Sequence, residues 1–252
     1  MTIIKIIILI LVSKAGFSQE IPNPQSLLEK WDKEFVLEEG LYNIQICGEP
    51  PEIRETNGFM FLNSKNDRMI QLRDSEGNST QKYLFIEEFK KYHLSIKNKP
   101  TIFKLNETDS MSTEVLKSSI SYYDLSGFFI EKNYTVEKME PYSSKDKKYW
   151  KIIVVSINKN FYNKLYVYVD KEKLLPYRID YFTKDGVLSK ILRVRYGKIP
   201  VQRKEVQENK EIISEMEMTR MGDSKKSYFK ILSLRTFPQI DQGLFSLKNL
   251  SL

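Results

Sequence analysis

Polar and apolar residues alternate with a period of two over most of the chain after residue 40, and this alternation predicts β-strands. Turn sequences such as Asn57-Gly58, Glu76-Gly77-Asn78 and Asp185-Gly186 separate the alternating segments, and the last of these is a hairpin signal. The predicted strands cover residues 41–47, 59–62, 68–73, 82–89, 92–96, 101–105, 149–157, 164–170, 177–182, 187–196, 211–219 and 227–237. Many short strands with short connections are typical of an antiparallel sheet or barrel.

Three segments depart from this period. Residues 24–37 carry Leu27, Leu28 and Trp31 at helical spacing after a proline-rich start, which predicts an amphipathic helix that ends near Gly40. Residues 106–130 are first polar and then aromatic, which indicates a long loop with a short helix, and such loops are often lids or binding segments. Residues 241–250 fit a short helix or a final strand. No repeat or linker divides residues 19–252, so we expect one α+β domain.

Several predicted strands carry apolar residues on both faces, so the second face needs a cover of its own. Ordinary core packing and an aromatic-lined pocket for lipid tails both explain this pattern and the many tyrosines and phenylalanines. In a strictly alternating strand 211–219, Ile212, Met216 and Met218 would share one face. The candidates for lining a lipid cavity are Trp150, Ile152, Val154, Tyr166, Tyr168, Ile212, Met216 and Met218, and the candidates for a lid are Tyr122, Tyr123, Phe128 and Phe129.

The first residues combine a basic start with an apolar run. Lys5 precedes residues 6–12, which are all branched aliphatics, and Gly16-Phe17-Ser18 places small residues before a cut at Gln19. This pattern predicts a cleaved secretory signal over residues 1–18 and a mature chain outside the cytoplasm. The apolar run is shorter than the roughly 20 residues that a membrane span needs.

The charge of the chain is mildly basic and evenly spread. The formal net charge is +7 with Lys5 and Lys14 of the leader included, and lysines are interspersed with acidic residues. We therefore expect a solvated surface and no nucleic acid partner. Cys47 is the only cysteine, which excludes an internal disulfide, so the apolar core must hold the fold together.

Motifs that carry chemistry are scarce. The single histidine, His93, falls on the polar face of a predicted strand, and we expect it at the surface. The sequence contains no Gly-x-Ser-x-Gly elbow, no glycine-rich phosphate loop and no acidic calcium loop. Adjacent carboxylates such as Glu87-Glu88 point to opposite faces of a strand. We expect no catalytic residue, no metal site and no cofactor; a hydrolase with two distant carboxylates is the minority alternative.

Several short motifs follow one another from about residue 112 onwards. They are Ser121-Tyr122-Tyr123-Asp124-Leu125, Val169-Asp170-Lys171, Leu175-Pro176-Tyr177-Arg178, Tyr181-Phe182 with Asp185-Gly186, and Phe245-Ser246 with Leu250. In type and order they resemble motifs of the outer-membrane lipoprotein-sorting family, the LolA-like periplasmic proteins. The predicted N-terminal helix also stands where that family has one. Residues 101–106 and 198–201 depart from the family's pattern.

The resemblance implies a fold and a function. The fold would be an unclosed antiparallel β-barrel, or half-barrel, with an N-terminal helix and a helical plug on its concave face. The protein would be a soluble periplasmic carrier that holds acyl chains of lipoproteins or other lipids for transfer toward the outer membrane, without catalysis. An inner-membrane transporter as donor and an outer-membrane acceptor would be its partners. A second hypothesis is a periplasmic sensor or accessory protein of the same fold that regulates a membrane-protein partner.

Overall fold

The computed structural model of the chain describes residues 21–35, 38–48, 55–86, 90–95, 101–105, 114–126, 130–157, 162–222 and 225–250. Over these residues, thirteen strands form one continuous sheet in the order β6-β5-β4-β3-β2-β1-β13-β12-β11-β10-β9-β8-β7. The strands are β1 (Gly40–Gly48), β2 (Thr56–Leu62), β3 (Arg68–Arg73), β4 (Ser79–Ile86), β5 (Lys90–Ser95), β6 (Thr101–Leu105), β7 (Tyr134–Ser144), β8 (Lys147–Ser156), β9 (Tyr162–Asp170), β10 (Pro176–Thr183), β11 (Leu188–Arg203), β12 (Val206–Arg220) and β13 (Lys226–Thr236).

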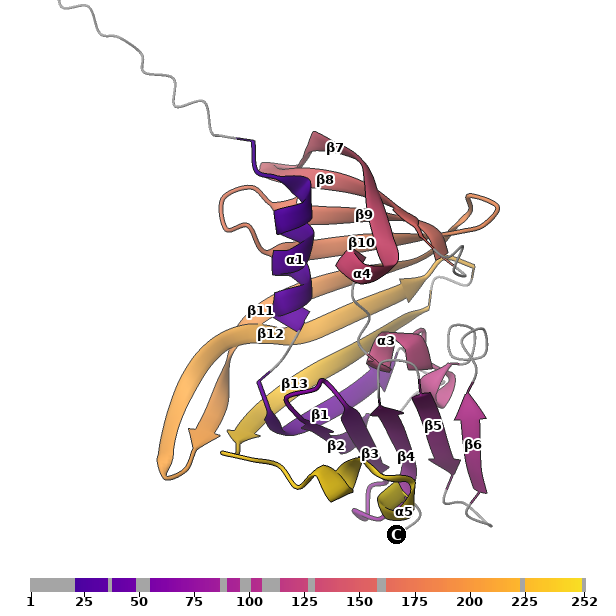
Figure 1. Cartoon of the computed structure of the whole chain (residues 1–252), viewed down its shortest axis with the longest axis vertical. Helices are drawn as coiled ribbons and strands as arrows, with labels where there is room; N and C mark the ends of the chain where they lie inside the picture. The colour runs from indigo at the N-terminus through magenta and orange to yellow at the C-terminus, as the bar shows by residue number, and fades with distance from the viewer. Residues whose placement is uncertain are drawn as a thin grey trace, which may run out of the picture.

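The chain builds this sheet as two halves that meet in its middle. The strands β1 to β6 follow one another outward to one edge, and β7 to β13 run inward from the other edge (Figure 1). The halves join where β1 pairs antiparallel with β13, from Gly40 opposite Thr236 to Gly48 opposite Ser227. A twisted sheet of this many strands curls, and its edge strands β6 and β7 remain unpaired with each other. The predicted unclosed half-barrel is confirmed.

Helix α1 (Pro24–Phe35) lies across the concave face of the sheet (Figure 1). Pro24 occupies the first helical position, where a missing N–H costs nothing, and the Asn23 side chain accepts a hydrogen bond from the backbone of Gln25 at 2.8 Å. Leu27, Leu28 and Trp31 are buried beneath the helix. The predicted helix over residues 24–37 is confirmed up to Phe35; residues 36 and 37 lie outside the described part.

The segment between the two edge strands also lies on the concave side. It contains the 3₁₀ turn η1 (Val115–Lys117) and the short helices α3 (Tyr122–Ser126) and α4 (Ile130–Asn133). Ser121 and Asp124 form a capping box at the start of α3, because one Asp124 carboxylate oxygen accepts from the backbone N and from the Oγ of Ser121, both at 2.8 Å. The predicted loop with a short helix is confirmed; residues 106–113 and 127–129 lie outside the described part.

The C-terminal segment covers the opposite face of the sheet. It forms the 3₁₀ turn η2 (Gln242–Phe245) and helix α5 (Leu247–Leu250). Phe245 and Leu250 pack there against Met69, Leu84 and Leu94, whose neighbours along the strands point to the concave side. The β3–β5 region is therefore covered on both faces. Within the described residues, no helix is long and apolar enough to cross a membrane.

The sequence pattern missed one strand, and the strands that it shortened most are β11 and β12. Edge strand β7 is mostly exposed and carries Glu137, Glu140 and Pro141, so it lacks the apolar alternation by which strands are recognised. The strands β11 and β12 continue past the predicted ends at residues 196 and 211 into a long hairpin, where Arg203 lies opposite Val206. Most of the outer part of this hairpin is solvated, which again removes the alternation.

Candidate functional site

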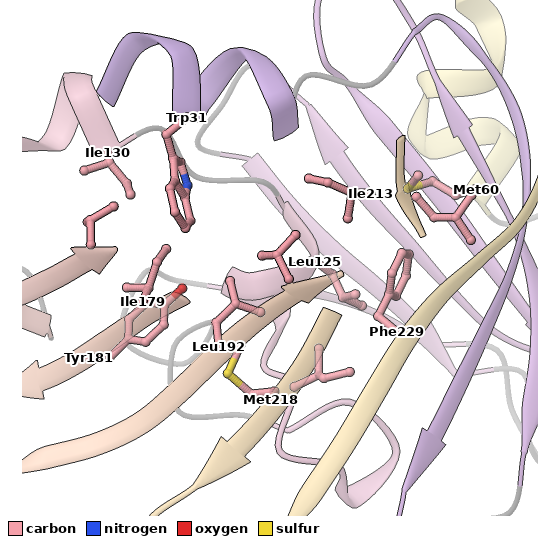
Figure 2. Packing of buried hydrophobic residues seen from close by; sticks show 14 of the residues in the cluster. Trp31, Met60, Leu125, Ile130, Ile179, Tyr181, Leu192, Ile213, Met218 and Phe229 are labelled. Atoms are coloured by element: carbon pink, nitrogen blue, oxygen red, sulfur yellow. The ribbon is translucent and has the colours of Figure 1, made fainter. Parts of the chain in front are cut away.

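An apolar pocket lies between the concave face of the sheet, helix α1 and helix α3. Figure 2 shows side chains from the helices and from both halves of the sheet pointing toward one another around this space. The residues that line the pocket are Trp31, Met60, Arg68, Ile120, Asp124, Leu125, Ile179, Tyr181, Leu192, Ile213, Met216, Met218, Phe229 and Ile231. Apart from Arg68 and Asp124, this lining carries no charge, so the pocket favours an apolar occupant.

The pocket is small in the closed form that the structure describes. Its volume is about 60 Å³, whereas one water needs about 10–15 Å³ of such space and ligand sites span roughly 300–1,000 Å³. A long acyl chain would therefore need part of the wall to move. The strands are tied into the sheet by backbone hydrogen bonds, so the short helix α3, with Ile120 before it, is the part of the wall that can be displaced most easily.

Arg68 of β3 holds the C-terminal end of α3. Its Nη1 donates to the backbone oxygen of Leu125 at 3.2 Å, and its Nε and Nη2 donate to the Asn66 side chain at 3.3 and 3.0 Å. Arg68 is only 7% exposed, and burial lowers the pKa of its guanidinium to about 10 while nearby Tyr42 opposes that shift. A cation at the C-terminal end of a helix also meets the favourable pole of the peptide dipoles.

Lys190 of β11 holds α3 through Asp124, the middle residue of the helix. Its Nζ lies 2.6 and 2.7 Å from the two carboxylate oxygens of Asp124, and both side chains are more than nine-tenths buried. The ammonium also lies 4.8 Å from the ring centre of Tyr162 and 4.9 Å from that of Tyr181. Burial by itself lowers the pKa of Lys190, but the Asp124 carboxylate outweighs burial and the pKa is raised. One polar contact from each half of the sheet thus fastens α3 over the pocket.

The two methionines predicted for the cavity line the pocket, and the isoleucine predicted beside them does not. Met216 and Met218 face the pocket, where Ile213 replaces the predicted Ile212. The reason is a β-bulge: Glu215 lies opposite Arg195, but the next pair joins Ile213 to Tyr196 and leaves an extra residue between them. Such a bulge shifts the alternation by one residue, which a strictly alternating pattern could not reveal.

The candidates on β8 and β9 divide between the two faces of the sheet. Trp150, Ile152 and Val154 belong to the buried cluster on the concave face but do not reach the pocket wall. Tyr166 and Tyr168 lie on the other face, because their cross-strand partners are Ile153 and Lys151.

This corrects the predicted grouping of the two tyrosines with Trp150. On the convex face, Tyr166 contacts Phe182 and lies 4.1 Å below the Lys151 ammonium, while Tyr168 donates to Asp180 at 3.1 Å. The second apolar face of these strands is therefore covered in part by aromatic rings and by long cationic side chains, rather than by the lipid cavity that we considered.

The predicted lid residues are only partly placed at the pocket. Tyr122 and Tyr123 of α3 are buried, but Ile120, Asp124 and Leu125 contact the pocket instead. Phe128 and Phe129 lie outside the described residues. The composition of residues 106–130 indicated a segment that could cover a site. It could not show which side of the short helix α3 faces inward, because that depends on how the helix is capped and held to the sheet.

Several residues of the pocket were not singled out from the sequence. They are Trp31, Met60, Arg68, Ile179, Tyr181, Leu192, Phe229 and Ile231. Most carried a usable signal, since they occupy one face of a predicted strand or helix. Arg68 carried none, because a charged residue at the start of a strand is ordinary.

His93 is half-buried, whereas an exposed surface position was predicted. Its ring stacks on Tyr83 at 4.9 Å between centroids and lies 6.1 Å from Phe103, and the Tyr122 hydroxyl of α3 is 3.4 Å from its Nδ1. Burial lowers the pKa of His93. The alternation correctly placed Leu94 and His93 on opposite faces of β5. It could not show that helix α3 covers the face that carries His93.

We expect the stability of the protein to fall as the pH decreases through about 6.5, the ordinary pKa of histidine. The folded state holds His93 at a lower pKa than the unfolded state, so the unfolded state binds protons more readily. The loss between pH 7.5 and 5.5 should be at most about 1 kcal/mol, since the side chain is partly solvated. Urea unfolding of the wild type and of His93→Phe at both values checks this. His93 is the only histidine, so an equal loss in the variant would contradict the assignment.

Comparisons with known proteins agree with this architecture. One family model matches residues 63–251 and carries the description "-like: Uncharacterized protein". No curated protein matches the chain in sequence.

Solved structures match over nearly the whole chain. A LolA-superfamily protein from Nitrosomonas europaea has a TM-score of 0.70 and 14% identity, covering 91% of this chain and 100% of its own. A DUF1329 family protein from Desulfovibrio piger has a TM-score of 0.68 and 15% identity, covering 90% and 97%. A putative outer-membrane lipoprotein-sorting protein domain from Vibrio parahaemolyticus has the same TM-score and identity, covering 90% and 98%. At these identities the likeness shows a shared fold. The chain therefore belongs to the family of the model that matches residues 63–251, and its fold is that of the LolA-superfamily and lipoprotein-sorting structures.

Proposed function

We propose that this protein is a periplasmic carrier that shelters the acyl chains of lipoproteins or other lipids, without catalysis. The observation that carries the proposal is the apolar pocket beneath α3, a helix held to the sheet by polar contacts that include those of Arg68 and Lys190. The fold that the chain shares with a putative lipoprotein-sorting domain supports it.

The free energy gained by burying an acyl chain can be compared with the cost of displacing helix α3. Each buried methylene contributes about 0.8 kcal/mol, so roughly ten methylenes contribute about 8 kcal/mol. Breaking a buried ion pair such as Asp124–Lys190 costs about 3–5 kcal/mol. Displacing α3 also uncovers its own buried side chains such as Leu125, so in this proposal a long acyl chain offsets more of the total cost than a short one does. The closed form shields the apolar wall from water when no cargo is bound.

The proposed location rests on the N-terminal leader. Residues 1–18 lie outside the described residues, so the signal peptide remains a prediction from the sequence. In this proposal the mature chain is released into the periplasm, takes its cargo from an inner-membrane transporter and delivers it to an outer-membrane acceptor. Intact-mass measurement of the protein from a periplasmic extract should give a chain that begins at Gln19.

A pair of adjacent substitutions on β13 tests whether the pocket holds lipid. Ile231 lines the pocket and is 3% exposed, while Leu232 points away and is 45% exposed. We expect Ile231→Trp to weaken binding of a fluorescent long-chain fatty-acid probe at least about tenfold by filling the space, and Leu232→Trp to leave it unchanged. Circular dichroism melting of both variants verifies folding.

Native mass spectrometry of the purified wild type should also reveal co-purified lipid. Absence of lipid together with no binding of the probe would reject the carrier and favour the alternative of a protein that regulates a membrane partner. Equal binding by Ile231→Trp and the wild type would place the lipid elsewhere on the molecule.

A further inference from the structure

The pocket wall contains a buried arginine, Arg68, whose hydrogen-bond partners within the described residues carry no charge. The partners of Arg68 there are the backbone oxygen of Leu125 and the side chain of Asn66, which are dipoles without net charge. A buried cation without an anion is costly. A guanidinium carries five N–H donors, so Arg68 can donate to an occupant of the pocket as well.

Lys190, a second buried cation, also has a partner that belongs to helix α3. In the described part of the chain, the carboxylate that pairs with Lys190 is that of Asp124, and Asp124 belongs to α3. The other polar groups near the Lys190 ammonium are the phenol rings of Tyr162 and Tyr181, which are neutral at ordinary pH because burial raises the pKa of both hydroxyls.

Displacement of α3 would therefore change the charge of the pocket. Withdrawal of the helix removes the Leu125 oxygen from Arg68 and the Asp124 carboxylate from Lys190 at the same time. Arg68, which lines the pocket, and Lys190, which contacts Asp124 but does not itself line the pocket, would then have no anionic partner among the described residues. The oxygens of a ligand can then bind where the Asp124 carboxylate and the Leu125 carbonyl of α3 lie in this structure.

We propose that the pocket takes an amphipathic anion, an acyl chain that ends in an anionic oxygen group, and that Arg68 and Lys190 bind this head group in place of α3. The inference rests on the proposed carrier function and specifies its ligand class. The head group can be the carboxylate of a free fatty acid or the phosphate of an acidic phospholipid. Charge-assisted hydrogen bonds to either group offset the contacts that the plug loses.

The wild-type protein by itself tests this selectivity. Binding of palmitate and of hexadecanol, which share the chain length, is measured at neutral pH by competition with a neutral fluorescent acyl probe. Phosphatidylglycerol and phosphatidylethanolamine with identical chains form a second pair. We expect the anionic member of at least one pair to bind about tenfold or more tightly. A preference in the first pair identifies a fatty acid, and one in the second identifies a phospholipid.

Substitution of Arg68 then locates the head group. Arg68→Met should reduce the preference, because only Lys190 then remains to bind the head group, while the neutral ligand still binds; Arg68→Lys should keep more of the preference. Arg195→Met is the matched control, because Arg195 lies on the convex face and is 62% exposed. Equal binding of anionic and neutral ligands by the wild type, or an unchanged preference in Arg68→Met, would overturn the inference and leave the carrier intact. Failure of every acyl ligand to bind would instead reject the carrier itself.

Discussion

Replacing Lys190 by methionine is expected to lower the free energy of unfolding by about 3–5 kcal/mol. The substitution leaves the Asp124 carboxylate buried without the ammonium that lies 2.6 and 2.7 Å from its oxygens. A carboxylate in an apolar wall must then take up a proton, attract water or leave with its helix. Urea unfolding followed by far-ultraviolet circular dichroism measures the loss.

A double-mutant cycle separates this ion pair from the other roles of its members. Asp124→Asn retains an oxygen that can cap α3 at Ser121 but removes the charge, so it should also destabilise the fold strongly. The variant that carries both substitutions should be less destabilised than the sum of the two single variants, since no buried charge remains. Simple additivity would mean that the two side chains do not interact.

The stability that the Asp124–Lys190 ion pair contributes should also depend on pH in the alkaline range. The folded state raises the pKa of Lys190, so the contribution of the pair is fully present below the ordinary lysine pKa and is lost as the pH rises through the raised value. Lys190→Met should remove that alkaline loss. Because the variant loosens α3, it should also load a fluorescent acyl probe faster than the wild type.

Truncation of Trp31 to alanine is expected to destabilise the protein by about 3–5 kcal/mol. Trp31 is 2% exposed and joins helix α1 to the pocket wall, where Figure 2 shows its indole pointing into the space between the helix and the sheet. Removal of the ring leaves a cavity that the curved sheet cannot close, because its strands are fixed by their backbone ladders.

Two further variants define the Trp31 effect. Trp31→Phe should recover part of the loss, since a smaller ring fills part of the space. Lys33→Ala on the exposed side of the same helix should change stability by no more than about 0.5 kcal/mol. Circular dichroism is the suitable signal for urea unfolding, because Trp31 is one of only two tryptophans and its loss alters fluorescence directly. A loss below 1 kcal/mol for Trp31→Ala would show that α1 is dispensable for the core, by the usual scale of surface substitutions.

The alternation of residues determined most of the sheet. It located β3 and β6 at their observed bounds and placed Leu94 and His93 on opposite faces of β5. It failed at β7, where an exposed edge strand carries charges and a proline, because alternation arises from burial of one face and this edge has little buried surface. The alternation of polar and apolar residues reveals a strand only where one face of that strand is buried.

The tertiary structure decided which residues line the pocket. The sequence indicated which segments are apolar and that residues 106–130 hold a loop with a short helix, and two residues that it named, Met216 and Met218, line the pocket. A single bulge exchanged Ile212 for Ile213, and the register of β8 with β9 turned Tyr166 and Tyr168 outward. Such shifts depend on hydrogen bonds between strands, which leave no mark on hydrophobic periodicity.

The chain by itself thus determined the strands, the first helix, the plug segment and the family resemblance, since these follow from local periodicity and short motifs. Only the folded structure brought Arg68 and Lys190, which are far apart in the sequence, to neighbouring residues of one short helix. Helix α3 supplies the carboxylate that pairs with Lys190 and one of the oxygens that accept from Arg68. Such a dependence between distant residues arises when the two halves of the sheet curl around the same helix, and no local pattern records it.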